Sequence, residues 1–375
     1  MTTTDARPTI LIIDDEPQTV QALADALRAR GEYEIEVHEP DDVAITEDLL
    51  RDSALILVDF QLKRWARATA PHPTDRVADG LALAAMIRRF LVGDEEAPPP
   101  PPQAIALVTG AFRRLAHPLP DENRQHTFSR LNNLEWIFLK ANQDEALATQ
   151  VSLLARAVSE LPVRWTEESA MGELFRLLRV PHGAKAGASV EREILAAGPP
   201  IHEFATASHG VAFLRWMLHR ILPYPTFLLD DFRLAARLGL TIDGLRAELG
   251  SATPLATFLA PARYDGVLAG FMGDRWWRPA VEHLLWESTG GRSFQSGPVT
   301  ELLTRLCGRL PEFHGIEDPV VARNGDFESF RIVPLESAVP IRPDDWPPFA
   351  DPAWTTQEMV EADQRLAALI IREDL

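Results

Sequence analysis

The chain has 375 residues, enough for about two or three domains. Its 55 acidic residues outnumber its 37 basic ones, and 46% of its residues are hydrophobic, which is ordinary globular composition. The net charge of -18 disfavours a generally basic nucleic-acid binder, because phosphate neutralisation needs clustered cations. A single cysteine, Cys307, excludes an internal disulfide and favours a reduced, cytoplasmic protein. No apolar run reaches the roughly 18 residues of a membrane span, and the first residues do not resemble a signal peptide, so no membrane contact is expected.

The first 160 residues alternate short apolar runs with amphipathic stretches. The apolar runs predict strands at 9–13, 54–58, 104–108 and 136–139, and a second, weaker strand is predicted at 33–38. The stretches between them have apolar residues at helical spacing and predict helices at 17–30, 41–51, 79–91 and 142–160. This alternation is typical of an α/β fold, with a parallel sheet, helices on both faces and right-handed crossovers.

From residue 167 onward the pattern is mainly helical. The apolar spacing predicts helices at 167–179, 190–197, 209–222, 226–238, 242–249, 274–288 and 298–307. We therefore expect a boundary near 161–166, which separates a first domain at 1–160 from a mostly helical domain at 161–375.

Strand patterns return in the last part of the chain. A β hairpin is predicted at 319–335, with Asn324-Gly325 as its turn. Residues 337–354 are rich in Pro and Trp and are expected to be irregular. A final helix is expected at 355–372, with Thr355 or Thr356 as its cap.

Polar side chains follow four of the five predicted strands. Asp14-Asp15 follow the first strand, Asp59 the third, Thr109 the fourth and Lys140 the fifth. Because the carboxyl ends of parallel strands meet at one edge of a sheet, we expect these side chains to converge. Three close carboxylates repel one another unless a cation joins them, and Mg²⁺ prefers this kind of oxygen site. With the metal bound, a carboxylate can attack a phosphoryl group, while Lys140 and Thr109 stabilise the transferred oxygens.

Five segments carry a family resemblance. In chain order they are ILIIDDEP, LILVDFQL, DGLALAAMIR, IALVTG and WIFLKAN. Together they resemble the receiver domain of bacterial two-component response regulators over about residues 8–160, which implies a flavodoxin-like sheet of five strands. The resemblance implies that Asp59 accepts a phosphoryl group from a histidine kinase or a phosphotransfer protein. It also implies that Mg²⁺ is held by Asp14, Asp15, Asp59 and the main-chain carbonyl of Gln61.

The same resemblance assigns the remaining site residues. Thr109 matches the switch hydroxyl of the family and Lys140 its phosphate-contacting lysine. Phe138, two residues before that lysine, matches the aromatic residue that rotates on activation.

Three departures from the family pattern accompany these matches. An insertion at 60–78 is either a lid or partner element that tunes phosphate lifetime or kinase choice, or a tolerated surface loop. It carries Lys63, Arg64, Trp65 and Arg67. The segment between Thr109 and Lys140 is longer than is usual and belongs to the face at which many receivers dimerise. A homodimer is therefore an open alternative, and the family's dimer geometry is not assumed for it. Ala141 replaces the proline that commonly follows the lysine.

The second half contains one recognisable submotif. Residues 232–249, FRLAARLGLTIDGLRAEL, resemble a helix-turn-helix with Thr241 capping the second helix. That helix has Asp243 and Glu248 against one Arg246, whereas a DNA-recognition helix presents cations and amides to the duplex. A helical hairpin inside a bundle is therefore favoured, and DNA binding is the weaker alternative.

Other residues of the second half suggest packing more than chemistry. Trp276, Trp277 and Trp286 are expected in the core, with a partner-binding surface as the alternative. The histidines have no metal-ligand spacing, and His202, His209 and His219 are expected at the surface or in caps. No separate active site is recognised in residues 165–375.

The sequence thus predicts a cytoplasmic response regulator in which phosphorylation of Asp59 switches the C-terminal domain, with a protein effector as partner. One alternative is a phosphate sink without its own output. Others are a phosphorylation-gated enzyme with its site in 165–375, and a DNA binder at 232–249.

Overall fold

The computed structural model describes residues 7–70, 77, 79–92, 101–112, 125–140, 144–181, 186–206, 210–250, 253–323, 330–343 and 346–371. Contacts within the chain define two compact units. The first consists of Met1–Leu177 and Pro200–His219, and the second of Leu178–Pro199 and Arg220–Leu375. The chain therefore leaves the first unit, returns to it and leaves it again. The domain boundary expected near 161–166 stays a prediction.

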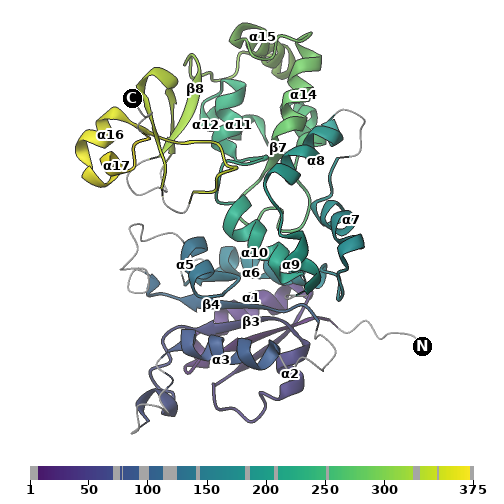
Figure 1. Cartoon of the computed structure of the whole chain (residues 1–375), viewed down its shortest axis with the longest axis vertical. Helices are drawn as coiled ribbons and strands as arrows, with labels where there is room; N and C mark the ends of the chain where they lie inside the picture. The colour runs from purple at the N-terminus through teal and green to yellow at the C-terminus, as the bar shows by residue number, and fades with distance from the viewer. Residues whose placement is uncertain are drawn as a thin grey trace. The chain divides into compact units, whose positions relative to one another are not determined.

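The first unit contains a five-stranded sheet whose neighbouring strands are all parallel (Figure 1). Its strands are β1 (Thr9–Ile13), β2 (Glu34–His38), β3 (Ser53–Asp59), β4 (Ala104–Thr109) and β5 (Trp136–Leu139). They lie in the order β2-β1-β3-β4-β5, which is the order of flavodoxin-like, doubly wound folds. The predicted α/β class and the five predicted strands are confirmed.

Helices cover both faces of this sheet. They are α1 (Gln21–Arg30), α2 (Glu47–Asp52), α3 (Gly80–Val92), α5 (Gln125–Leu131) and α6 (Asp144–Ser159), with 3-10 turns η1 (Pro17–Thr19) and η2 (Ala66–Thr69) before α1 and α3. The helix predicted at 41–51 begins later, because the Thr46 hydroxyl accepts the Leu49 N–H and caps α2. The sequence pattern does not predict α5, whose seven residues make only two turns.

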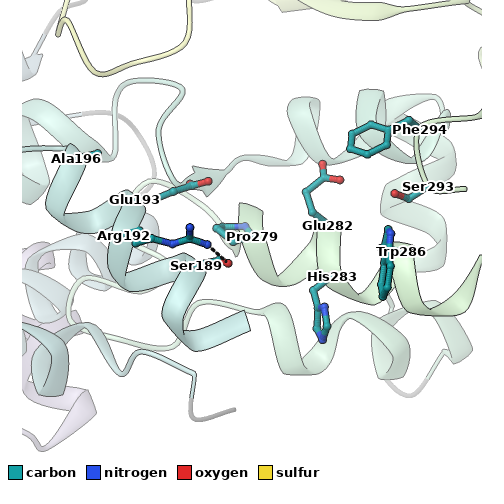
Figure 2. A pocket seen from close by; sticks show the side chains of 10 residues that line it. All are labelled: Ser189, Arg192, Glu193, Ala196, Pro279, Glu282, His283, Trp286, Ser293 and Phe294. Carbon is teal, nitrogen blue, oxygen red and sulfur yellow. Dashed lines mark hydrogen bonds between the residues drawn. The ribbon is translucent and has the colours of Figure 1, made fainter. Parts of the chain in front are cut away.

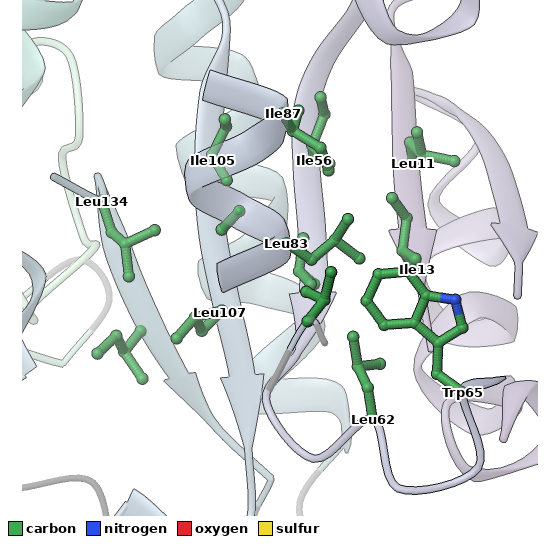
Figure 3. Packing of buried hydrophobic residues seen from close by; sticks show 14 of the residues in the cluster. Leu11, Ile13, Ile56, Leu62, Trp65, Leu83, Ile87, Ile105, Leu107 and Leu134 are labelled. Atoms are coloured by element: carbon green, nitrogen blue, oxygen red, sulfur yellow. The ribbon is translucent and has the colours of Figure 1, made fainter. Parts of the chain in front are cut away.

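The strands β1, β3 and β4 are buried on both faces, which explains their continuous apolar runs, whereas the edge strand β2 is largely exposed or half-buried. On one face, alternate strand residues such as Leu11, Ile56 and Ile105 pack against Leu83 and Ile87 of α3 (Figure 3). Each such side chain contributes about 1.5–3 kcal/mol through burial. This core fixes the register of the parallel strands. The residues that follow the strands therefore lie together at the carboxyl edge of the sheet.

Residues 200–219 return to the first unit after a segment of the second. The helices around this return are α7 (Glu167–Leu178), α9 (Ile201–Thr206), α10 (Val211–Trp216) and the π-helix η4 (Met217–Ile221). The single helix predicted at 209–222 is therefore an α-helix followed by a π-helical segment. The Phe213 ring of α10 lies 6.4 Å from the Trp165 ring, which joins the returning segment to the chain after α6.

The second unit is mostly helical, as predicted. Its main helices are α8 (Ala186–Ala196), α11 (Asp231–Leu238), α12 (Ile242–Glu248), α13 (Pro254–Leu259), α14 (Arg278–Ser288) and α15 (Ser296–Cys307). The described residues of the chain include no helix with the length and apolar character to cross a membrane.

Two predicted helices of this unit are shorter than expected. Instead of helix, their first residues form the strands β6 (Leu228–Leu229) and β7 (Trp276–Trp277), which pair antiparallel. Asp230 then caps α11 by accepting the Arg233 N–H at 2.8 Å. Helical periodicity cannot reveal a two-residue strand, because its pairing partner is distant in the sequence.

The predicted hairpin is part of a small sheet of four strands. Its strands are β8 (Pro319–Arg323), β9 (Phe330–Pro334), β10 (Ala338–Ile341) and β11 (Ala353–Thr356), in the order β10-β11-β8-β9. β8 and β9 are antiparallel, whereas the expected turn at Asn324-Gly325 lies outside the described residues. The expectation of irregular chain at 337–354 is wrong, because β10 and β11 pair there.

The final helix is divided into α16 (Gln357–Ala362) and α17 (Gln364–Ala368). Thr356 caps α16 as predicted, with its hydroxyl accepting the Met359 N–H. The break comes at Asp363, whose carboxylate accepts the Arg365 N–H and starts a second helix.

Candidate functional site

Three carboxylates meet at the carboxyl edge of the five-stranded sheet. Oxygen atoms of Asp14, Asp15 and Asp59 all lie within 4.8 Å of one another. Asp14 follows β1 and is only 2% exposed, while Asp59 ends β3 and is 7% exposed. The sequence prediction that these side chains converge is thus fulfilled by the fold.

One cation lies among these acids. The Nζ atom of Lys140, directly after β5, is 2.6 Å from Asp59 Oδ1 and 3.1 Å from Asp14 Oδ2. Burial raises the pKa of Asp59, although the ammonium of Lys140 opposes this. Burial alone would lower the pKa of Lys140, but the two carboxylates raise it overall. The Lys140 ammonium is therefore shared by two carboxylates, and Asp15 adds a third acid to the cluster.

Backbone N–H groups orient two of the carboxylates. Asp14 Oδ1 accepts the Glu16 N–H at 2.8 Å, and Asp59 Oδ2 accepts the Gln61 N–H at 2.6 Å. The Gln61 carbonyl accepts the Lys63 N–H at 2.9 Å. The expected role of this carbonyl as a metal ligand stays a prediction.

The remaining predicted residues lie in the same sheet. Thr109 is buried at the end of β4, where its hydroxyl accepts the Ala111 N–H at 2.9 Å and its carbonyl accepts the Lys140 N–H at 2.8 Å. Phe138 is fully buried in β5. The fold therefore brings every predicted residue to β1, β3, β4 or β5, or to the chain directly after them.

A glycine permits the helix α3 to start directly against Asp59. The Gly80 N–H donates to the Phe60 carbonyl at 2.9 Å. A Cβ atom at position 80 would lie 1.8 Å from the Asp59 carbonyl oxygen, far inside van der Waals contact. Only glycine fits this approach, so Gly80 is a positioning residue that sequence spacing alone does not identify.

The donor set fits a hard divalent cation. Three carboxylates provide oxygen ligands, two of them buried and the third, Asp15, partly buried. A single lysine neutralises one of the three negative charges, which leaves an excess that Mg²⁺ would balance. The residues present are therefore chemically suited to hold Mg²⁺.

A second buried acid was not singled out by the sequence analysis. Glu135, directly before β5, is completely buried. Its carboxylate forms ion pairs with Arg88 of α3 and, at 2.7 Å, with Arg215 of α10, and it accepts the Ile105 N–H at 2.5 Å. The Glu135 carbonyl is 2.9 Å from His219 Nε2. The partners lie up to 84 residues away, so no local pattern could have revealed this cluster.

The expectation that His219 lies at the surface is wrong. His219 is buried in η4, and burial lowers its pKa to about 4, so the imidazole is neutral at neutral pH. By contrast, His202 is exposed as expected and lies 2.9 Å from the Glu167 carboxylate. His209 lies outside the described residues.

In the second unit, α11 and α12 form the predicted helix pair. Thr241 caps α12 by accepting the Gly244 N–H at 3.0 Å. Arg246, the one base of the second helix, is 2.8 Å from the Asp231 carboxylate. This internal ion pair is consistent with a helical hairpin inside a bundle.

A pocket of about 550 Å³ lies between α8 and α14 of this unit. Figure 2 shows its walls, with Arg192 and Glu193 on α8 and Glu282, His283 and Trp286 on α14. Both carboxylates are held in ion pairs, Glu193 with Arg278 at 3.1 Å and Glu282 with Arg237 at 2.5 Å. The pocket therefore lacks the free carboxylates of an acid–base site.

The expected packing of the tryptophans is found at two of the three positions. Trp276 and Trp277 are buried as expected, whereas Trp286 is 48% exposed at the pocket.

Comparisons with known proteins add little to this geometry. No family model and no curated protein matches the sequence. Among solved structures, the chain is similar to the response regulator ChrA of a heme-sensing two component system, with 12% identity and a TM-score of 0.25 over 81% of this chain and 100% of that chain. It is also similar to NtrX from Brucella abortus in complex with ATP, with 19% identity and a TM-score of 0.26 over 53% of this chain and 41% of that chain.

Proposed function

We propose that this protein is a response regulator of a phosphorelay. In this proposal Asp59 accepts a phosphoryl group from a histidine kinase or a phosphotransfer protein. The observation that carries it is the double ion pair of Lys140 with Asp59 and Asp14 at the carboxyl edge of a β2-β1-β3-β4-β5 sheet. A lysine so placed can hold the oxygens of a phosphoryl group that becomes attached to Asp59.

The transfer step follows from these positions. An oxygen of the Asp59 carboxylate bonds to phosphorus while the bond from phosphorus to the donor nitrogen breaks, and the electron pair leaves with that nitrogen. Mg²⁺ would be held by Asp14, Asp15, Asp59 and the Gln61 carbonyl. When bound, it neutralises negative charge on the phosphoryl oxygens. Lys140 exchanges its contact with the Asp59 carboxylate for one with the phosphoryl oxygens.

The effect of phosphorylation at Asp59 is proposed to reach the second unit through a shift of β5. Lys140 follows this strand and Glu135 precedes it, so the two lie roughly 17 Å apart at about 3.3 Å per residue. When Thr109 moves toward the phosphoryl group and Phe138 reorients, β5 shifts, and with it the ion pair of Glu135 with Arg215. Arg215 belongs to the segment through which the chain leaves the first unit, at His219–Arg220.

This arrangement favours a regulator over a phosphate sink. A sink needs no contact between its acceptor domain and the chain that continues into a second unit. Here Glu135 binds Arg215 and His219 immediately before that exit. A protein effector is the proposed partner, because the one base of the candidate DNA-recognition helix, Arg246, is already paired with Asp231.

The test uses the full chain with acetyl phosphate and Mg²⁺, followed by intact mass measurement. Wild type should gain the mass of one phosphoryl group, and Asp59→Asn should gain none. Asp52→Asn, which changes an exposed aspartate seven positions earlier, is the matched control and should behave as wild type. Equal labelling of wild type and Asp59→Asn would refute the proposal.

A regulator and a sink are then separated by hydrogen exchange of the second unit. A regulator should show altered exchange after phosphorylation, whereas a sink should turn over phosphate with no such change.

A further inference from the structure

Residues 60–70 of the insertion after β3 pack into the core of the first unit. We call residues 60–70 the strap. Two of its side chains are almost completely buried, with Leu62 2% and Trp65 5% exposed. Both belong to the apolar cluster of the sheet, and Figure 3 shows them beside Ile13 at the end of β1. A loop that was merely tolerated at the surface would not place a tryptophan in the core.

The same strap is fastened to the acidic site. Its Gln61 N–H donates to Asp59 Oδ2 at 2.6 Å, and its Arg64 N–H donates to Asp15 Oδ2. The Arg64 guanidinium adds an ion pair, with Nε 2.6 Å from Glu16 Oε1. The strap backbone thus runs from the carboxylate that ends β3 to the acidic residues that follow β1, across the rim of the site.

The end of the strap that is farther from β3 is also held by contacts, which Arg67 makes. The carbonyl of Arg67, within η2, accepts the Val77 N–H at 3.2 Å. The Arg67 guanidinium lies 5.9 Å from the Trp65 ring and 3.8 Å from Asp41 Oδ1. Contacts at both ends and in the middle therefore hold the strap in one position, with Trp65 as the residue that contributes most buried area.

We propose that the strap is a lid that shields the acyl phosphate at Asp59 from water, with Trp65 as its anchor and Arg64 as its latch. This inference rests on the proposed function of Asp59. In hydrolysis a water oxygen bonds to phosphorus and the bond from phosphorus to the Asp59 oxygen breaks, which returns the carboxylate, releases inorganic phosphate and frees a proton. Exclusion of water by the strap slows this step. Trp65 and Arg64 are positioning residues, because neither side chain contacts the reacting atoms.

The lifetime of the acyl phosphate tests the lid. The full chain is labelled with acetyl phosphate and Mg²⁺, freed of donor, and followed by intact mass. Trp65→Ala should shorten the lifetime by about three- to tenfold, and Trp65→Phe, which keeps a ring in the core, should restore most of it.

Leu91→Ala is the matched control. Leu91 is a buried member of the same cluster, but it lies eleven residues along α3 from Gly80, roughly 16 Å from the site at 1.5 Å per residue. Its truncation weakens the core by a similar amount without touching the strap. Equal lifetimes of Trp65→Ala and Leu91→Ala would overturn the lid.

A second variant keeps the core intact. Arg64→Ala removes only the exposed ion pair with Glu16, so it should fold normally, and should both shorten the lifetime and raise hydrogen exchange in residues 61–68. An unchanged lifetime and exchange pattern in Arg64→Ala would remove the latch from the proposal. Failure of wild type to gain any phosphoryl mass would instead refute the function of Asp59, so the two failures are distinct.

Discussion

The replacement Glu135→Gln is the most direct test of the buried ion pairs that Glu135, directly before β5, forms with Arg88 and Arg215. The Glu135 carboxylate has no exposed surface, and it binds two arginines, Arg88 and Arg215. Burial alone would raise its pKa, but the two guanidinium groups and the Ile105 N–H lower it overall, so the group is ionised at neutral pH. Glutamine keeps the shape of the side chain, but it removes the charge and replaces one of the two acceptor oxygens by an amide donor that faces another N–H donor.

The loss in the free energy of unfolding can be worked out from the arginine charges that stay buried without the carboxylate. Removal of one partner of a buried ion pair costs about 3–5 kcal/mol, because the other charge stays buried without compensation. The Arg88 and Arg215 side chains keep 16% and 29% of their surface exposed, so water compensates in part. We therefore expect a loss near the lower end of that range, about 3 kcal/mol.

Urea unfolding followed by circular dichroism measures this loss. The control is Glu32→Gln, because Glu32 forms an exposed ion pair with Arg156 at 3.0 Å, and such pairs contribute less than about 1 kcal/mol. Hydrogen exchange should also rise in α10, which carries Arg215. A midpoint shift no larger than that of Glu32→Gln, with α10 still protected, would refute the stabilising role of the cluster.

Two further predictions concern Gly80, which has no room for a Cβ atom, and the buried imidazole of His219. Gly80→Ala should destabilise the protein by about 2–3 kcal/mol, because the alanine Cβ would collide with the Asp59 carbonyl. Calorimetry should also show weaker Mg²⁺ binding by this variant. Gly172→Ala, in an open position of α7, should instead stabilise by up to about 1 kcal/mol, and equal thermal midpoints of the two variants would contradict the argument. Because the pKa of His219 is about 4 when folded and 6.5 when unfolded, the unfolded state binds more protons between these values. Stability should therefore fall by about 3 kcal/mol as pH drops from 6.5 to 4. His219→Asn should flatten this part of the profile, and an unchanged slope would show that another group is responsible.

The acidic site could be predicted because each of its residues has a local signature. Asp14, Asp59, Thr109 and Lys140 each end or follow an apolar run, and parallel strands bring such positions to one edge. The sheet order brings them together at that edge, where Lys140 lies 2.6 and 3.1 Å from the two carboxylates. Gly80 lies in the segment DGLALAAMIR, but only the atoms around it show that no other residue fits there.

Other features depend on partners that are distant along the chain. Glu135 has no periodicity or motif around it, and its pairing with Arg215 joins residues 80 positions apart. His219 was misplaced for the same reason, because a histidine in a helical stretch gives no sign of what packs on it. The strands β10 and β11 are not predicted by the sequence, because their buried residues Ile341 and Ala353 pack with Leu366, a partner that only the folded chain brings to them.

By itself, the sequence determined the α/β class of the first 160 residues, the five strands and the acidic edge, since alternating patterns and strand ends are local properties of the chain. Only the tertiary structure decided that residues 200–219 return to the first unit and that Trp65, after β3, is buried near Ile13 at the end of β1. The physical reason is that burial and ion pairing depend on which surfaces meet, and distant segments meet only after the chain has folded.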